Sequence, residues 1–375
     1  MRAIQMVDLR SQYDLIKPEV DQAIQEVIDT TAFINGPQVK SFSSSLAAYT
    51  GAKYVITCGN GTDALQIAMM GLDFQPGQEV IVPAFTYVAT AEVIALLGLV
   101  PVFIDVIGTT YELDITQLES KITSKTAGIV PVHLYGQCSN MEAILAVAKK
   151  HNIKVIEDTA QAIGAKYTFS DGRVRQAGTM GDVGTTSFFP SKNLGCYGDG
   201  GAMFTNSAEL AEKLHMIANH GQMKKYHHHI VGVNSRLDTL QAAILNVKLQ
   251  HLDRYSTSRN EVADAYDKAF AGHTHIKIPI RATNSTHAFH QYTIQVEGVS
   301  RDELKSYLAE KGVPSMVYYP LPLHQQEAYK NLGFKKGDFP VAESLCEKVL
   351  SLPIHTEMKA EDQEYIIEAI NRFFE

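Results

Sequence analysis

Several features that would assign a chain to a specialised class are missing from this sequence. Its 375 residues include only four cysteines, Cys58, Cys138, Cys196 and Cys346, and no two of them form a C-x-x-C pair. This scarcity predicts neither a disulfide framework nor a zinc knuckle. No apolar stretch reaches the length of a membrane span, and residues 1–8 lack the apolar core of a signal peptide. We therefore expect a cytoplasmic enzyme in a reducing compartment.

An excess of basic residues is also missing. The formal net charge is -8, whereas proteins that bind nucleic acid or anionic membranes usually carry basic surfaces. We expect neither kind of partner. With 45% hydrophobic and 20% charged residues, the composition is that of an ordinary globular enzyme. The length favours one large domain with a smaller one.

The first two thirds of the chain contain an alternation of strands and helices. After two helices, expected at 17–29 and 39–50, short runs rich in Val and Ile alternate with helical segments. The expected strands are 54–57, 79–83, 102–105, 128–132, 155–158, 185–189 and 202–205. This pattern predicts a mostly parallel sheet that is buried on both faces. Ligands of such sheets gather at the carboxyl ends of the strands.

The alternation is lost after Tyr255. The remaining pattern is that of an α+β unit. Its expected elements are a helix at 260–270, a strand at 290–296, a helix at 301–311, a strand at 317–319 and a helix at 360–374. We therefore divide the chain into a large domain, residues 1–252, with an N-terminal helical segment at 1–40, and a small C-terminal domain, residues 253–375.

A lysine ends one of the apolar runs. Residues 185–191 precede Lys192, and a glycine-rich turn at 195–201 follows it. A lysine at the end of a buried strand loses hydration, which lowers its pKa and makes the amine a nucleophile. A solvated loop lysine is the commoner explanation for a single residue of this kind, so other motifs must decide.

Two further motifs follow predicted strands. The loop 59–63 leads into a helix, and free N–H groups at a helix N-terminus bind anions such as phosphate, with Thr62 adding a hydroxyl. Asp158 closes another strand, with Gln161 shortly after it, and a buried carboxylate needs a positive partner. The alternative for each motif is a plain helix cap.

Together these motifs suit pyridoxal phosphate (PLP). This cofactor needs a lysine for covalent attachment, an acidic partner for its ring nitrogen and an anion site for its phosphate. An aromatic residue within 83–87 adds a surface on which the ring could stack. The order phosphate loop, aspartate, lysine is more specific than any of its parts.

The motifs at 61–65, 83–87, 157–161, 187–192 and 234–238 resemble those of the DegT-type nucleotide-sugar aminotransferases, which are PLP enzymes of fold type I. The resemblance covers residues 5–370. It implies a large domain with a mostly parallel seven-stranded sheet and a smaller C-terminal α+β domain. It also implies a homodimer whose active sites are shared between subunits, and a role in the biosynthesis of cell-surface polysaccharides such as lipopolysaccharide O-antigen.

The resemblance also implies roles for individual residues. Lys192 would carry the cofactor, Asp158 would bind the ring nitrogen, Gln161 would bind the ring hydroxyl, and Tyr87 would stack on the ring. The phosphate would be held by Gly61, Thr62, Asp63 (through its backbone), Ser187 and, from the partner subunit, Asn234.

Within the family the chain most resembles the UDP-2-acetamido-2-deoxy-3-oxo-hexuronate 3-aminotransferases, over 187–206 and 220–236. The arginine of that group that matches Arg236 is expected to bind the sugar carboxylate, and glutamate is the expected amine donor. The expected substrate-binding residues are Phe33, Ser191, Arg236, Tyr318 and Tyr319. Two of them depart from the usual pattern, because Phe33 stands where a tyrosine is expected and Tyr318 where a histidine is expected.

Three alternatives stay open. The substrate could be a dTDP- or UDP-linked 3- or 4-keto-6-deoxy sugar. The dehydratases of the same family carry a histidine in place of Lys192, and a non-catalytic regulatory homologue is expected to have lost Lys192 or Asp158. We expect no metal site, because consecutive histidines such as His227, His228 and His229 cannot all face one ion.

Overall fold

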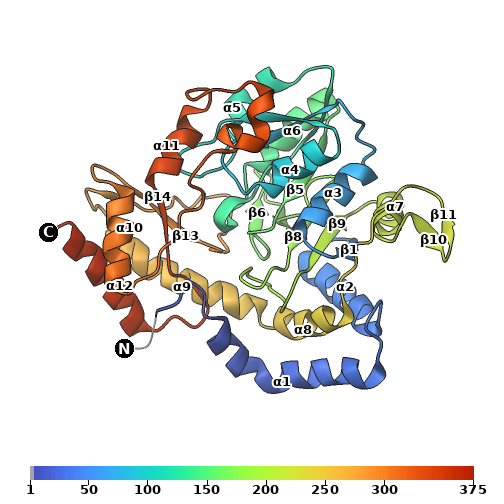
Figure 1. The fold of residues 1–375 in the computed structure, drawn as a ribbon, viewed down its shortest axis with the longest axis horizontal. Coiled ribbons are helices and arrows are strands. Elements are labelled where there is room, and N and C mark those ends of the chain that lie inside the picture. The colour runs from blue at the N-terminus through green and yellow to red at the C-terminus, as the bar shows by residue number, and fades with distance from the viewer. Residues whose placement is uncertain (1–3) are drawn as a thin grey trace.

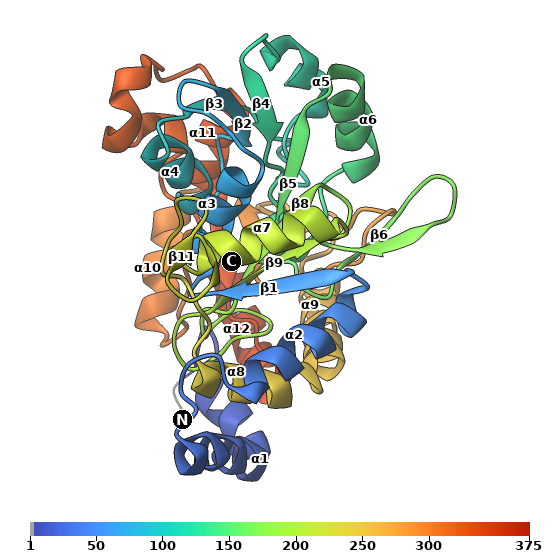
Figure 2. The ribbon, with the colours of Figure 1, turned by 90° about the vertical axis from the view of Figure 1, so that its right-hand side faces the viewer.

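The fold is built around a seven-stranded sheet in the computed structural model, which describes residues 4–375 (Figures 1 and 2). The strand order is β1-β9-β8-β5-β4-β2-β3. Both pairings of β9 are antiparallel, and the others are parallel. The bounds are β1 Tyr54–Cys58, β2 Glu79–Pro83, β3 Val100–Ile104, β4 Thr126–Ile129, β5 Lys154–Asp158, β8 Val183–Ser187 and β9 Gly201–Thr205. The predicted seven-stranded, mostly parallel sheet is confirmed.

Helices cover both faces of this sheet. One face packs against α3, α4 and α7, and the other packs against α2, α5, α6 and α8. Alternate residues of β2 enter opposite cores, because Val80 and Val82 join the first and Ile81 joins the second. The helix bounds are α2 Pro37–Thr50, α3 Gly61–Gly71, α4 Ala89–Leu96, α5 Ile115–Leu118, α6 Met141–His151, α7 Ala208–Ala218 and α8 Thr239–Leu249.

The first helix begins earlier than predicted. Helix α1 spans Leu9–Thr30, whereas the sequence predicted residues 17–29. Asp8 caps the helix by accepting a hydrogen bond from the Ser11 backbone. Pro18 lies inside the helix and removes one of its hydrogen bonds. The apolar contacts of Ile16 and Val20 with α8 offset that loss. Residues 1–3 of the predicted segment 1–40 lie outside the described part of the chain.

The C-terminal third forms a separate three-stranded antiparallel sheet with its own core. Its predicted α+β character is confirmed. The elements are α9 Leu252–Phe270, β12 Ile276–Lys277, β13 Tyr292–Val296, α10 Arg301–Glu310, α11 Pro340–Lys348, β14 Val349–Leu352 and α12 Ala360–Phe373. Helix α9 begins at Leu252, earlier than the predicted residue 260, and the division into two domains at 252 and 253 stays a prediction.

Three predicted strands need correction, and one is the strand predicted at 128–132, which spans Thr126–Ile129. Residues 317–319 are not a strand, and the pairing nearest to them is a single bridge between Met316 and Ser351. The strand predicted at 185–189 ends at Ser187. Phe188 is buried against Phe42, but Phe189 is 53% exposed, because the chain leaves the sheet between Ser187 and Phe188. The prediction from the apolar run therefore placed the end of the strand too late.

Two hairpins were not predicted. One consists of β6 Lys166–Thr168 and β7 Val174–Gln176, and the other of β10 Gln222–Lys224 and β11 His227–His228. The second projects from the body of the protein beside α7 and carries two residues of the histidine run (Figure 1). Among residues 4–375, no helix is long and apolar enough to span a membrane.

Candidate active site

The carboxyl ends of β1, β2, β5 and β8 meet at one edge of the sheet, where they open into a cavity of about 670 Å³. Most of the predicted site residues line this cavity. They are Gly61, Thr62, Asp63, Tyr87, Asp158, Gln161, Ser187, Ser191, Lys192, Tyr318 and Tyr319. The parallel topology brings the residues at the strand ends to one place, and Tyr318 and Tyr319 join them from the C-terminal third of the chain.

The start of α3 forms one wall of the cavity. The side chain of Asn60 caps the helix and accepts a hydrogen bond of 2.8 Å from the backbone of Asp63. The N–H of Asp63 is thereby engaged, which leaves those of Gly61 and Thr62 to face an anion. A Cβ on Gly61 would lie 2.7 Å from the Cβ of Ser187, so only glycine allows α3 to approach β8 this closely.

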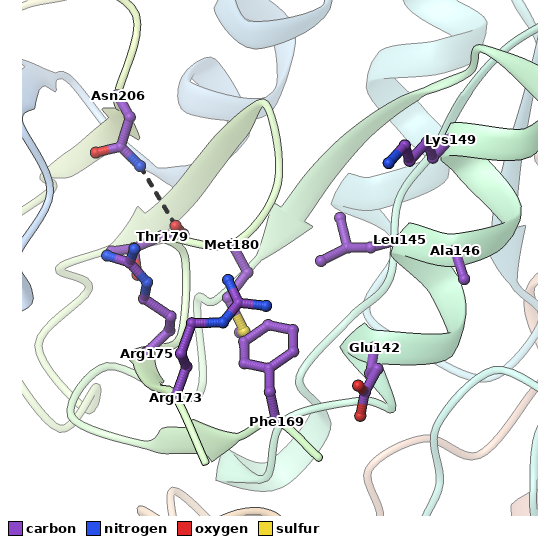
Figure 3. Close-up of a pocket in the computed structure, with 10 residues that line it drawn as sticks. All are labelled: Glu142, Leu145, Ala146, Lys149, Phe169, Arg173, Arg175, Thr179, Met180 and Asn206. Carbon is purple, nitrogen blue, oxygen red and sulfur yellow. Dashed lines mark hydrogen bonds between the residues drawn. The ribbon is translucent and has the colours of Figure 1, made fainter. Parts of the chain in front are cut away.

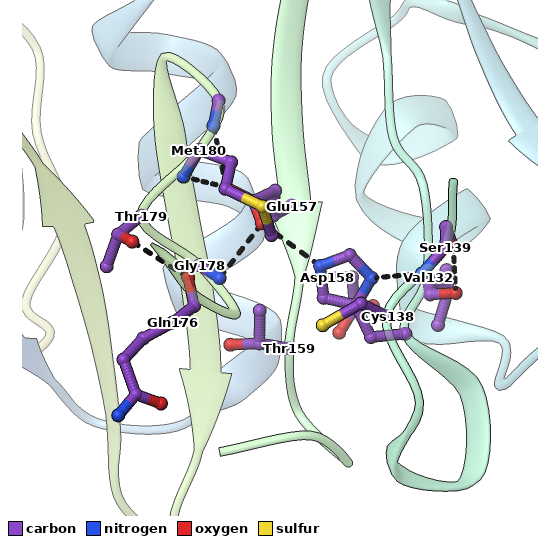
Figure 4. A network of polar contacts seen from close by, with 12 residues as sticks. Val132, Cys138, Ser139, Glu157, Asp158, Thr159, Gln176, Gly178, Thr179 and Met180 are labelled. Atoms are coloured by element: carbon purple, nitrogen blue, oxygen red, sulfur yellow. Dashed lines mark hydrogen bonds and ion pairs between the residues drawn. The ribbon is translucent and has the colours of Figure 1, made fainter. Parts of the chain in front are cut away.

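Strand β5 ends in two neighbouring carboxylates with different surroundings. Glu157 is fully buried and accepts four hydrogen bonds (Figure 4). Three come from the backbone of Gly178, Met180 and Gly181, at 2.6–2.9 Å, and one comes from the His133 ring at 3.0 Å. This carboxylate is saturated and holds the turn before β8 against β5.

Asp158 points to the opposite side of the strand and lines the cavity. Its carboxylate accepts hydrogen bonds from Thr90 Oγ1 at 2.8 Å and from the Ala160 backbone at 3.1 Å. Each carboxylate oxygen can accept a further bond. Of the two neighbours, Asp158 is therefore the carboxylate that can receive a donor from a ligand in the cavity.

Lys192 follows β8 and lines the same cavity. Loss of hydration lowers the pKa of its amine to about 8, although the nearby Asp158 carboxylate acts in the opposite direction. At neutral to mildly alkaline pH a useful fraction of this lysine is therefore the free, nucleophilic amine.

Gln161 and two tyrosines also line the cavity. The Gln161 amide accepts a hydrogen bond from the Tyr135 backbone at 2.7 Å and donates one to the Tyr319 hydroxyl at 3.1 Å. The rings of Tyr87 and Tyr319 lie 6.0 Å apart. Tyr87 is 56% exposed, so its ring is available to a planar ligand.

Three predicted site residues lie outside this cavity. Phe33 is exposed in the turn between α1 and α2, and Asn234 is exposed after the hairpin β10–β11. Arg236 lines a second cavity of about 430 Å³ together with Lys40 and His215. No acidic residue of the described chain lines that second cavity, and neither Arg236 nor Lys40 forms an ion pair within residues 4–375.

The sequence did not indicate every residue that lines the first cavity. Asn60 could have been recognised as a helix cap, because asparagine often precedes a first turn. His290 and Gln291 carried no local signal, since they enter the cavity from the C-terminal third of the chain. Burial lowers the pKa of His290 well below its ordinary value, and the charges of Lys192 and Arg259 lower it further.

Another cavity, of about 390 Å³, lies between α6 and the hairpin β6–β7 (Figure 3). Arg173, Arg175 and Lys149 line it together with Glu142. None of the predicted site residues contributes to this cavity, so it is separate from the site around Lys192.

The cavity around Lys192 fits PLP in the chemistry of its side chains. This cofactor requires a nucleophilic amine, a carboxylate that can accept a further hydrogen bond, an amide and a helix N-terminus with free N–H groups, and the cavity contains all four. Comparison with known proteins agrees with this fit. The family model for the DegT/DnrJ/EryC1/StrS aminotransferase family matches residues 14–371.

Three relatives are similar over nearly the whole chain. A "Pleiotropic regulatory protein" of Geobacillus stearothermophilus is 48% identical, over 99% of this chain and 98% of that protein. The UDP-2-acetamido-2-deoxy-3-oxo-D-glucuronate aminotransferase of Pseudomonas aeruginosa is 47% identical, over 94% and 95%. The dTDP-3-amino-3,6-dideoxy-alpha-D-galactopyranose transaminase of Aneurinibacillus thermoaerophilus is 42% identical, over 99% of each chain.

Solved structures share the fold. S. venezuelae DesV superposes with a TM-score of 0.96 at 38% identity, covering 100% of this chain and 99% of that chain. NtdA of Bacillus subtilis, solved with the cofactor PMP (the aminated form of PLP), superposes with a TM-score of 0.87 at 32% identity, covering 95% and 81%. Family, fold and cavity chemistry agree, and the chain therefore belongs to the DegT/DnrJ/EryC1/StrS family as a PLP-dependent sugar aminotransferase.

Proposed function

We propose that this protein transfers an amino group from glutamate to C3 of a UDP-2-acetamido-2-deoxy-3-oxo-hexuronate. The observation that carries the amine-transfer part is the single cavity that contains Lys192, Asp158, Gln161 and the open start of α3. The similarity to the Pseudomonas aeruginosa enzyme supports the choice of sugar.

The cofactor would be held by groups on three walls of the cavity. The N–H groups of Gly61 and Thr62, with the hydroxyls of Thr62 and Ser187, would bind its phosphate. Asp158 would bind the ring nitrogen, Gln161 the ring hydroxyl and Tyr87 the ring face. Asp63 would contribute less than the sequence suggested, because its N–H donates to Asn60.

When bound, PLP supplies an electron sink for the carbon that loses its proton. Lys192 would carry the cofactor at rest and would move that proton once its amine is free. Asp158 would keep its carboxylate against the ring nitrogen, so that the ring stays protonated. The saturated neighbour Glu157 would take no part in the chemistry and would hold β5 and β8 together.

The substrate would lie between two subunits of a homodimer. Phe33 and Asn234 are exposed, Arg236 is half-buried, and all three lie outside the Lys192 cavity. In a dimer with shared sites, these residues would enter the cavity of the partner. Ser191, Tyr318 and Tyr319 would contact the sugar from the same subunit as Lys192.

Arg236 would recognise the carboxylate of the sugar. A guanidinium binds a carboxylate through two parallel hydrogen bonds, and the cavity around Arg236 contains Lys40 and His215 but no acidic side chain among the described residues. An anionic group would therefore find uncompensated positive charge there.

A second candidate substrate is a dTDP-linked keto-6-deoxy sugar, as the name of the Aneurinibacillus thermoaerophilus relative suggests. We place it second because that relative is 42% identical to this chain, against 47% for the Pseudomonas aeruginosa enzyme, and Arg236 alone does not decide between the two sugars. A purely regulatory role, suggested by the name of the Geobacillus stearothermophilus relative, would not require Lys192 and Asp158 in one cavity.

The test is an amine-transfer screen with glutamate that carries isotopically labelled nitrogen. The acceptors are UDP-linked 3-keto-hexuronates and UDP- or dTDP-linked 3- and 4-keto-6-deoxy sugars, and the readout is the mass of the nucleotide sugar. We expect label in the 3-amino product of the 3-keto-hexuronate, and Arg236→Gln should raise KM for that acceptor by about tenfold or more. Label in a neutral sugar alone would overturn the choice of substrate.

A further inference from the structure

The carboxylate of Asp158 accepts hydrogen bonds from a helix that packs on the sheet as well as from the turn that follows it. Its Oδ2 atom accepts a hydrogen bond of 2.8 Å from Thr90 Oγ1, and its Oδ1 atom accepts one of 3.1 Å from the Ala160 backbone. Ala160 belongs to the turn that follows Asp158. Thr90 is remote in sequence and is the side chain that reaches Asp158 from outside that turn.

Thr90 lies at the start of α4, and no part of it is exposed. Its hydroxyl is therefore removed from water and finds its partner in Asp158. The same segment carries Tyr87 and Ala89, which line the Lys192 cavity. The bond from Thr90 thus ties the wall that carries Tyr87 to the end of β5.

The backbone of Asp158 is fixed independently of Thr90. Its N–H donates to the Pro131 carbonyl at 3.0 Å, and its own carbonyl accepts from the His133 backbone at 3.0 Å. What these bonds leave free is rotation of the carboxylate about its side-chain torsion, which is broad for aspartate. Thr90 is placed where it restricts that rotation.

We infer that Thr90 is a positioning residue for the reaction: its hydroxyl fixes Asp158 Oδ2 so that the carboxylate presents its remaining lone pairs to the cavity. This inference rests on the proposed role of Asp158 toward the ring nitrogen. Thr90 itself does not line the cavity and does not touch a ligand there.

The alternative is that Thr90 only fills space. The two explanations differ in which atom of the side chain matters. If Thr90 fills space, its methyl group and volume decide the outcome. If it positions Asp158, the hydroxyl decides, because losing it leaves a buried carboxylate oxygen short of a donor.

The experiment compares Thr90→Ser with Thr90→Ala. Both variants lose the same methyl group, and only Thr90→Ala loses the hydroxyl. Thr90→Val restores the volume without the hydroxyl and serves as a second test if Thr90→Ala folds poorly. The readouts are the dissociation constant of PLP, the pH dependence of the visible absorption of bound cofactor, and the rate of the half-reaction with glutamate.

We expect Thr90→Ser to stay within about threefold of the wild type, and Thr90→Ala and Thr90→Val to lose about tenfold to a hundredfold in the half-reaction, as for a buried acceptor left unpaired. The pH dependence of the absorption should change in Thr90→Ala and Thr90→Val and not in Thr90→Ser. Equal spectra and rates in Thr90→Ser and Thr90→Ala would overturn the inference.

Asp158→Asn is measured alongside as the reference. If Asp158→Asn changes the spectrum and rate but the Thr90 variants do not, only the role of Thr90 is wrong. If Asp158→Asn also behaves like the wild type, the proposed role of Asp158 is wrong, and the inference about Thr90 is overturned with it.

Discussion

At the scale of single residues, the site depends on which polar groups can still form hydrogen bonds with a ligand. Glu157 and Asp158 are neighbours on β5, yet Glu157 has four donors around its two oxygens and Asp158 has two. The strand alternation sends one carboxylate into a structural network and the other into the cavity. Both residues are carboxylates, so what separates their roles is the number of hydrogen bonds that each can still accept.

The pH dependence of cofactor uptake follows from the pKa of Lys192. Because burial lowers that pKa to about 8, uptake of PLP by cofactor-free protein should accelerate as the pH rises and level off above about 8. Stopped-flow absorbance measures the rate, and Nα-acetyl-lysine, whose side-chain amine is free, serves as the control for the titration of PLP itself. A midpoint near 10.5, the ordinary value for lysine, would contradict the account.

Removing the charge of Asp158 should move this profile in a known direction. The carboxylate raises the pKa of Lys192, so Asp158→Asn should shift the midpoint of uptake to lower pH. A shift to higher pH would mean that the two side chains do not interact as the structure indicates.

The network around Glu157 should show itself in stability. In Glu157→Gln, one oxygen becomes an NH₂ group that faces donors, whichever way the amide turns. We expect a loss of about 2 to 4 kcal/mol in the free energy of unfolding of the cofactor-free protein, measured by urea denaturation. Glu310→Gln, at an exposed position at the end of α10, is the matched control. A loss in Glu157→Gln no larger than in the control would show that the network contributes little.

At the scale of elements, the site depends on how closely α3 approaches β8. In Gly61→Ala the new methyl group would lie 2.7 Å from Ser187 Cβ, which forces the phosphate wall away from the end of β8. Overpacking of this kind costs about 1 to 3 kcal/mol, so the dissociation constant of PLP should rise by about tenfold. Equilibrium dialysis measures it.

Gly108→Ala is the control for that variant, because a methyl group there would meet only a valine side chain at 3.3 Å. If Gly61→Ala binds PLP as well as Gly108→Ala does, the start of α3 does not form the phosphate site.

The elements that sequence could predict are those whose pattern is local. The strands and helices of the central sheet follow from apolar runs and periodicity, and all seven strands exist. The strand prediction at 317–319 was wrong because Tyr318 and Tyr319 line the cavity instead of pairing with a neighbouring strand. Strand β14 was also missed; it pairs with β13 and, through Ser351, with Met316.

The residues of the candidate site were likewise predictable where their signal is local. Lys192, Asp158 and Gln161 stand in motifs at strand ends, and the structure brings them together. His290 and Thr90 could not be found in this way, because their neighbours are set by tertiary packing. The cap that Asn60 gives to α3 is local, by contrast, and could have shown that the N–H of Asp63 is already used.

At the scale of the whole molecule, the residues predicted for the site fall into separate parts of one chain. The cavity around Lys192 and the cavity around Arg236 are lined by different residues. A symmetric dimer that places the second cavity of one subunit against the first cavity of the other would join them, because a two-fold interface uses the same surfaces on both subunits. The central claim is therefore that each active site takes Lys192 from one chain and Arg236 from the other.

Complementation between an inactive Lys192 variant and a weakened Arg236 variant, assayed at an acceptor concentration below the wild-type KM, tests this claim most directly. Lys192→Ala and Arg236→Ala are purified separately, unfolded, mixed in equal amounts and refolded with PLP, and amine transfer from glutamate to the 3-keto-hexuronate is measured. Each variant refolded alone is the control. We expect the mixture to recover about a quarter of wild-type activity, because about half of the dimers are mixed and each mixed dimer has one intact site. If the mixture is no more active than the two variants alone, the sites are not shared in this way.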